Sequence, residues 1–196
     1  MKKLISILFL SLFLTACSQT PELTLKNEPW EAHIEKIEKV ENWMLSGKLA
    51  IISPEERHSL NIYWQQKGND THLVLTTFIG TTVLDVKKTD QITQITDHNN
   101  KRYFSKDSAS LIKQLSGMDL PINQLKKWIK GSPDTASFEL NSNNLLLSLQ
   151  EKTEEAPWTV TYKSYKTVNN INLPYRIQLK RNNLRLKFAI SKWLVE

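Results

Sequence analysis

The sequence His58-Ser59-Leu60-Asn61-Ile62-Tyr63-Trp64-Gln65-Gln66 alternates large apolar and polar side chains at every second position. A β-strand places successive side chains on opposite faces of a sheet, so this alternation predicts a strand with one buried and one solvated face. Leu60, Ile62 and Trp64 would face the core. Residues 184–191 repeat the pattern, with Leu184, Leu186, Phe188 and Ile190 on the apolar face.

Less regular runs of the same kind extend the prediction to about eleven strands. They lie at residues 44–52, 72–78, 81–86, 91–96, 102–104, 135–140, 145–150, 158–166 and 175–180. Several of the segments between them, such as residues 67–70, 98–100, 141–144 and 181–183, are short and rich in Asn, Asp, Ser and Gly. These residue types favour tight turns, so neighbouring strands are expected to pair as antiparallel hairpins.

Three segments have a helical pattern instead. After Pro29, apolar residues recur at three-to-four spacing up to Val40, and residues 105–117 and 121–131 each carry apolar residues at similar spacing and end at a glycine. A long antiparallel sheet with one apolar face must curl or close to remove that face from water. We therefore expect a mainly β (α+β) fold, a barrel with helices inside or across its mouth. The pattern leaves open whether the helices fill the interior or leave it hollow.

The N-terminus has the features of a bacterial lipoprotein. Lys2 and Lys3 precede a thirteen-residue apolar run, Leu4 to Ala16, which is shorter than the roughly 20 residues that a membrane-spanning helix needs. The run ends in Leu14-Thr15-Ala16-Cys17, the pattern that directs lipid attachment to cysteine. We expect a signal peptide over residues 1–16, a lipidated N-terminal linker over 17–29 and a single domain over 30–196. The alternative is an uncleaved anchor or a sorting signal with an accidental cysteine.

Charge and cysteine content limit the possible functions. Cys17 is the only cysteine, so no disulfide can form within the chain. The formal net charge is +6, and the basic residues are scattered except for Lys180, Arg181, Arg185 and Lys187. This distribution does not favour nucleic-acid binding. The basic group is either a solvated strand face or a rim that meets acidic groups on a partner or anionic lipid headgroups.

The sequence gives little support for catalysis. The histidines at 33, 58, 72 and 98 are scattered, are expected to be solvated, and lack the spacing of a zinc site. Asp85, Asp97 and Asp134 are isolated acids, and the glycine-rich and nucleophile motifs of common enzyme classes are missing. We expect no catalytic residues, no metal and no cofactor apart from the covalent lipid on Cys17.

A series of motifs follows the lipid-attachment pattern in a fixed order. They are Trp30 and His33, Gly47-Lys48-Leu49-Ala50-Ile51, Trp64-Gln65-Gln66, Phe78-Ile79-Gly80-Thr81-Thr82-Val83-Leu84, Gly117-Met118-Asp119-Leu120-Pro121, Leu125-Lys126-Lys127-Trp128-Ile129-Lys130-Gly131-Ser132-Pro133, Leu173-Pro174-Tyr175-Arg176-Ile177 and Leu186-Lys187-Phe188-Ala189-Ile190-Ser191-Lys192-Trp193. Over essentially the whole mature domain the chain resembles the family of outer-membrane lipoprotein receptors called LolB, which is related to the periplasmic carrier LolA. The resemblance implies an open antiparallel barrel of eleven strands, with helices in its mouth and an apolar cavity.

The resemblance also implies a function. A member of this family is anchored in the outer membrane, faces the periplasm, accepts lipoproteins from the carrier and inserts them into the inner leaflet of the outer membrane without an energy source. The residue after the lipidated cysteine is Ser18 rather than Asp, which agrees with the outer membrane as the location. The implied partners are the carrier, cargo lipoproteins and outer-membrane lipid, and the protein is expected to be a monomer.

Three sets of site residues follow from the resemblance. Inward residues are candidates for an acyl-chain cavity, although each could instead be ordinary core: Leu60, Ile62, Trp64, Leu73, Leu75, Leu84, Leu145, Leu147, Leu186 and Phe188. The family's membrane-contacting loop corresponds to Phe78, Ile79 and Gly80, where the usual Pro-Leu-Gly is replaced, or else these residues end a strand in the core. Met118 and Trp128 are candidates for a movable lid, with core packing as the alternative.

Two other functions remain open from the sequence. The first is a non-catalytic scaffold or assembly lipoprotein of the envelope, which would have a filled core and no lipid cavity. The second is an enzyme acting on a lipid or cell-wall substrate, which would need polar and titratable side chains clustered inside the barrel.

Overall fold

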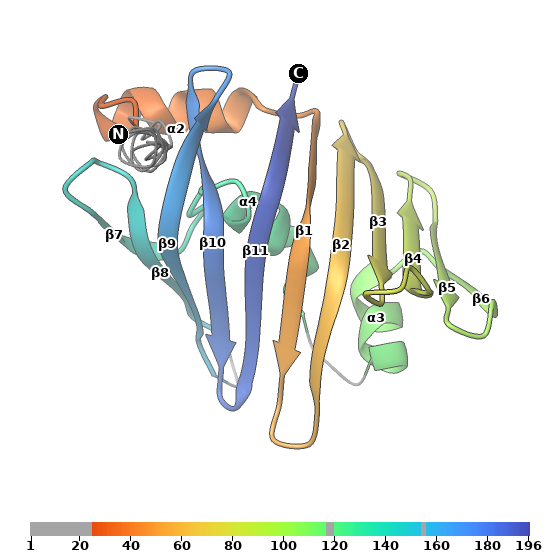
Figure 1. The fold of residues 1–196 in the computed structure, drawn as a ribbon. Coiled ribbons are helices and arrows are strands. Elements are labelled where there is room, and N and C mark those ends of the chain that lie inside the picture. Colours follow the sequence, from red (N-terminus) through yellow and green to blue (C-terminus); the bar gives the residue numbers. More distant parts are fainter. Residues whose placement is uncertain (1–24, 117–119, 154–155) are drawn as a thin grey trace, which may run out of the picture.

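A single antiparallel sheet of eleven strands forms the body of the protein (Figure 1). The computed structural model describes residues 25–116, 120–153 and 156–196. The strands are β1 (Trp43–Ile52), β2 (Arg57–Lys67), β3 (Asp70–Thr76), β4 (Thr82–Lys88), β5 (Thr93–Asp97), β6 (Arg102–Ser105), β7 (Ser137–Leu140), β8 (Leu146–Glu151), β9 (Trp158–Val168), β10 (Ile171–Arg181) and β11 (Leu184–Val195). The predicted fold class, a mainly β open barrel of about eleven strands, is confirmed.

The order of strands in the sheet explains why the barrel is open. It runs β6-β5-β4-β3-β2-β1-β11-β10-β9-β8-β7, so β6 and β7 are the two edges and are not bonded to each other. The chain between these edge strands contains α3 (Ser108–Ser116) and α4 (Ile122–Trp128). Because this connection must pass from one edge to the other, it crosses one face of the sheet, as Figure 1 shows.

The sheet has two distinct ends, which we call the loop end and the helix end. The β1–β2, β3–β4 and β10–β11 turns lie at the loop end, because alternate strands of an antiparallel sheet turn at the same side. The helix α2 (Trp30–Lys39) lies across the other end, beside the β9–β10 turn and the C-terminus (Figure 1).

The core lies between the sheet and the helices. Trp43 contacts Trp64 and Trp193 edge to face, with ring centroids 5.2 and 5.5 Å apart. From the helical side, α4 contributes Leu125 and Trp128 to the same cluster. A smaller cluster joins Val86 and Ile95 to Leu111 of α3, so both helices pack on the same face of the sheet.

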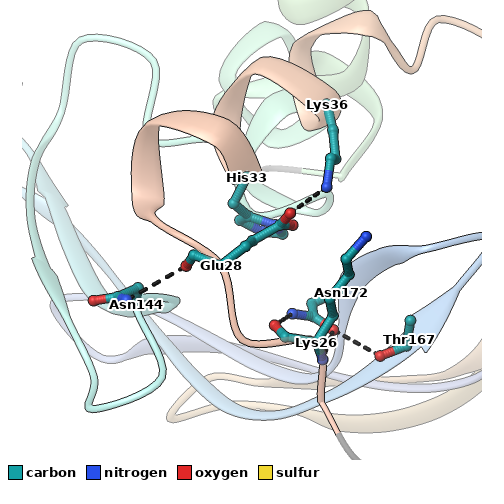
Figure 2. A network of polar contacts seen from close by, with 7 residues as sticks. All are labelled: Lys26, Glu28, His33, Lys36, Asn144, Thr167 and Asn172. Carbon is teal, nitrogen blue, oxygen red and sulfur yellow. Dashed lines mark hydrogen bonds and ion pairs between the residues drawn. The ribbon is translucent and has the colours of Figure 1, made fainter.

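The segment before α2 is bound to the helix end from Lys26 onward (Figure 2). The backbone N–H of Lys26 donates to Oδ1 of Asn172 over 3.1 Å, and Nδ2 of Asn172 donates to the Lys26 carbonyl over 2.7 Å. Thr167 also donates to Oδ1 of Asn172. Part of the segment assigned to the linker is therefore held by β10. Residues 1–24, which include the predicted signal peptide and Cys17, lie outside the described residues.

His33 is buried, which corrects the expectation that all four histidines are solvated. Its Nδ1 lies 3.4 Å from Oε1 of Glu28, and Lys36 donates to the other carboxylate oxygen of Glu28 (Figure 2). Burial lowers the pKa of His33 more than the nearby Glu28 raises it. Burial would raise the pKa of Glu28, but the bonds from Lys36 and His33 more than offset this and the pKa is lowered. The network fastens the start of α2 to the preceding segment.

Candidate functional site

An apolar cavity lies between the sheet and the helices α3 and α4. Its volume is about 120 Å³, and only apolar atoms face it. Five strands and both helices contribute to its wall. The lining residues are Leu49, Ile51, Ile62, Trp64, Thr71, Leu73, Leu75, Leu84, Val86, Lys88, Ser108, Ile112, Leu120, Ile122, Leu125, Lys126, Leu186 and Phe188. A cavity lined in this way offers water no hydrogen-bond partner, so it is expected to stay dry and to accept hydrocarbon.

Most of the predicted lining residues lie on this wall. They are Ile62, Trp64, Leu73, Leu75, Leu84, Leu186 and Phe188. The reason is the register of the strands: Ile62 lies opposite Leu75, and Leu75 lies opposite Leu84, so the inward positions of β2, β3 and β4 form one continuous row.

Leu60, Leu145 and Leu147 do not line the cavity. Leu60 is half-buried against the core, where it lies opposite Leu49 toward the loop end. Leu145 is buried in the β7–β8 turn, held by Asn141, whose side-chain oxygen accepts from the Leu145 backbone N–H over 3.2 Å. Neither residue is among those that line the cavity.

Leu147 is 43% exposed, so the expectation that it points inward is wrong. The cause is a β-bulge. Leu140 lies opposite Leu146 and Glu139 lies opposite Ser148, which leaves Leu147 as an extra residue on β8. A bulge breaks the alternation of faces. Leu146 and Leu149 therefore fill the inward positions instead.

The helices supply wall residues that the strand pattern could not identify. Ile112 of α3 and Ile122 and Leu125 of α4 cover the cavity from the side opposite the sheet. Their apolar spacing was visible in the sequence, but spacing within a helix does not say which strand residues the helix faces. The methylene stems of Lys88 and Lys126 also line the cavity, although a lysine in an alternating pattern normally indicates a solvated position.

The loop between β3 and β4 exposes two large apolar side chains at the loop end. Phe78 is 88% and Ile79 72% exposed. They lie between Thr77 and Gly80, whose backbone N–H donates to the Thr77 carbonyl over 3.0 Å, and the φ of Gly80 is +88°. A turn closed by a left-handed residue favours glycine at that position. The alternative that these residues end a strand in the core does not hold, because β3 ends at Thr76.

The loop lacks the proline that is usual in the family, and side-chain hydrogen bonds constrain it instead. The Thr77 hydroxyl accepts from the backbone N–H of Thr81 over 3.1 Å, and the side chain of Asn61 donates to the Thr77 carbonyl over 2.9 Å. The exposed tip is thus presented on a bonded turn attached to β2.

Of the two candidate lid residues, one can be placed. Trp128, the last residue of α4, is fully buried in the core, and its carbonyl accepts a 2.8 Å bond from the hydroxyl of Tyr162. It anchors α4 to β9 and does not line the cavity. The residues of α4 that cover the cavity are Ile122, Leu125 and Lys126. Met118 lies outside the described residues.

Residues 25–116, 120–153 and 156–196 contain no group of three or more His, Cys, Asp or Glu side chains that could hold a metal ion. In the same part of the chain, no helix is both long and apolar enough to cross a bilayer. The isolated acids are engaged locally: Asp97 accepts bonds from its own turn, and Asp134 pairs with Lys127 at 2.5 Å.

Fold and site together define a class of protein, the open antiparallel β-barrels whose mouth is crossed by helices and whose interior holds an apolar cavity. Within this class, the family model described as "Outer membrane lipoprotein LolB" matches residues 41–193. The chain belongs to the LolB family.

Relatives named outer-membrane lipoprotein LolB support this assignment over the whole length. The protein of Psychromonas ingrahamii is 47% identical and the match covers 100% of this chain and 98% of the relative. That of Tolumonas auensis is 35% identical over 96% and 95% of the two chains. Among solved structures, a LolA superfamily protein from Nitrosomonas europaea superposes with a TM-score of 0.55 at 10% identity, covering 86% of this chain and 94% of that one. The last likeness concerns the fold alone.

Proposed function

We propose that the protein is lipidated at Cys17, anchored in the outer membrane and facing the periplasm, and that it transfers lipoproteins. It accepts them from a LolA-type carrier and inserts them into the inner leaflet of the outer membrane. Family membership supports a place in lipoprotein localisation. The observation that carries the transfer step is the apolar cavity, combined with an exposed apolar loop on the same molecule.

The size of the cavity indicates how cargo enters. A cavity of roughly 150 Å³ holds one benzene molecule, so about 120 Å³ has room for only a short piece of an acyl chain. A whole acyl chain needs more space than this cavity offers. We expect Ile112, Ile122 and Leu125 to move outward with α3 and α4 on loading, because these helices cover the cavity from the side opposite the sheet and are not strands of the sheet.

The burial of hydrocarbon supplies the free energy for the transfer. Each buried methylene contributes about 0.8 kcal/mol, so covering a few more methylenes than the carrier, and fewer than the bilayer, sets the direction. No nucleotide-binding loop occurs in the sequence. We therefore propose an energy-independent and non-enzymatic step, without a cofactor other than the covalent lipid, carried out by a monomer.

The lipid anchor and the loop have different roles at the membrane. A lipid anchor with two or more chains holds the protein stably at the bilayer. Phe78 and Ile79 can then enter the headgroup region, because both are exposed and both belong to a loop without a charged residue.

Depletion of the protein in living cells tests this function. We expect other lipoproteins to accumulate in complex with a soluble periplasmic carrier, and expression of the intact chain to reverse the accumulation. The scaffold alternative predicts a filled interior, which the cavity argues against, and it predicts no accumulation. Normal delivery of lipoproteins in depleted cells would refute the proposal.

A further inference from the structure

Two lysines form part of the cavity wall. Lys88 is the last residue of β4 and Lys126 lies in α4, and both side chains are half-buried. Since only apolar atoms face the cavity, the lysines line it with their methylene stems, and their ammonium groups lie at its edge. Lys88 is opposite Thr71, the second residue of β3, so this edge is at the helix end of the sheet.

Neither ammonium group has an acidic partner within residues 25–116, 120–153 and 156–196. Their sequence neighbours do: Lys87 lies 3.9 Å from a carboxylate oxygen of Asp85, and Lys127 lies 2.5 Å from Asp134. Burial lowers the pKa of Lys126, and the charge of Lys88 lowers it further, so the two cations are close enough to repel each other.

Uncompensated positive charge beside a dry cavity favours a ligand that is apolar at one end and anionic at the other. A partly buried cation interacts with an anion more strongly than an exposed one, because the surroundings screen the charge less. A lipoprotein's cysteine is expected to carry a glycerol on a thioether, acyl chains on ester bonds and a further chain on an amide bond, and none of these groups has a negative charge. Binding of the uncharged lipid groups of cargo therefore does not explain two unpaired lysines at this edge.

We infer that the cavity also binds single-chain amphiphiles with an anionic headgroup, a carboxylate or a phosphate, placed between Lys88 and Lys126 with the tail directed toward Leu75 and Leu84. The inference rests on the proposed function, in that the cavity must admit an acyl chain. It adds a second class of ligand, which competes with cargo for the same hydrocarbon space.

Photolabelling of the full lipidated chain in phosphatidylcholine nanodiscs tests this site. The probes are palmitate and hexadecanol that carry the same diazirine on the tail, so they differ only in the headgroup, which is an anionic carboxylate in one and a neutral hydroxyl in the other. We expect palmitate to label the cavity wall about tenfold more than hexadecanol does. Equal labelling by the two probes would overturn the inference while leaving acyl-chain binding intact. Labelling of the wall by neither probe would refute the proposed function as well.

Matched variants assign the effect to the lysine pair. The double variant Lys88→Met and Lys126→Met keeps the stems and removes both charges, so palmitate labelling should fall to the hexadecanol level while hexadecanol labelling and Tm stay unchanged. The control, Lys87→Met with Lys127→Met, removes two charges from neighbouring positions that do not line the cavity. An equal loss in the control would overturn the role of Lys88 and Lys126.

Competition identifies the source of the anionic group. Excess lysophosphatidylglycerol that suppresses palmitate labelling more than lysophosphatidylcholine does would support binding of lipid phosphates. Suppression by free fatty acid alone would restrict the site to carboxylates. Equal suppression by both lysolipids and by hexadecanol would overturn headgroup recognition.

Discussion

We predict that Ile79→Glu blocks delivery of lipoproteins to membranes but leaves folding and acceptance of cargo intact. Full burial of an isoleucine or phenylalanine side chain is worth about 1.5–3 kcal/mol. Ile79 is 72% exposed in the free protein, so insertion into a bilayer could recover about 1–2 kcal/mol from this side chain. Loss of that contribution lowers membrane affinity about tenfold, before the cost of desolvating the new carboxylate is added.

The fold should not respond, because a substitution at an exposed position away from special backbone geometry changes the free energy of unfolding by about 0.5 kcal/mol or less. The assay has two stages: transfer of a labelled lipoprotein from the carrier to the purified protein, and its release into liposomes. Ile92→Glu is the matched control, since Ile92 is 44% exposed on the β4–β5 turn at the helix end. A normal rate of release by the Ile79 variant, or an equal defect in the Ile92 variant, would refute the reasoning.

Three further predictions concern the fold and the cavity. In the variant Gly47→Ala, the added Cβ would lie 2.3 Å from the carbonyl oxygen of Ala189, so β1 and β11 must separate. We expect the free energy of unfolding, measured by urea denaturation, to fall by several kcal/mol. The pKa of His33 is lowered in the folded protein, so as the pH falls below about 6.5 the unfolded chain binds a proton before the folded protein does. The stabilisation that depends on neutral His33 should therefore be complete above about pH 6.5 and decline below it. The pKa of Glu28 is also lowered, so its protonation should reduce the free energy of unfolding further below about pH 4.5. His33→Asn should flatten the decline in Tm between pH 7 and pH 5, and an unchanged slope would contradict this assignment. Leu84→Trp fills part of the cavity, so binding of a fluorescent fatty acid should fall severalfold while the far-ultraviolet circular dichroism is retained.

The sheet could be predicted from the sequence because alternating apolar and polar residues directly indicate which side chains point to each face of a strand. In β2, Ile62 and Trp64 occupy every second position, and the turns on either side are short, so strand and register follow together. The same reasoning failed at Leu147, because the run Leu145-Leu146-Leu147 fits either face and the bulge that decides between them depends on pairing with β7.

The site was less predictable because it forms between distant segments. The lysine pair brings β4 and α4 together. The spacing places Lys88 on the face of Leu84 and Val86, and Lys126 on the face of Ile122, but it does not show that these two faces meet at one cavity. His33 could have been recognised as buried, since it lies on the same helical face as Ile37 and Trp30. Its partner Glu28 precedes the helix, so the periodicity of the helix carries no information about this contact.

The unbonded gap between β6 and β7 has a consequence for the shape of the cargo that can be handled. A lipoprotein is a folded body joined to its acyl chains by an acylated cysteine, and a fully closed wall would require that body to be threaded through a ring of strands. Because the barrel is open, the proposed transfer requires no such threading, and we expect the attached polypeptide to remain in solvent while the acyl chains are bound. On the proposed function, the size of the attached polypeptide then does not limit transfer, and we expect the protein to accept lipoproteins of very different sizes.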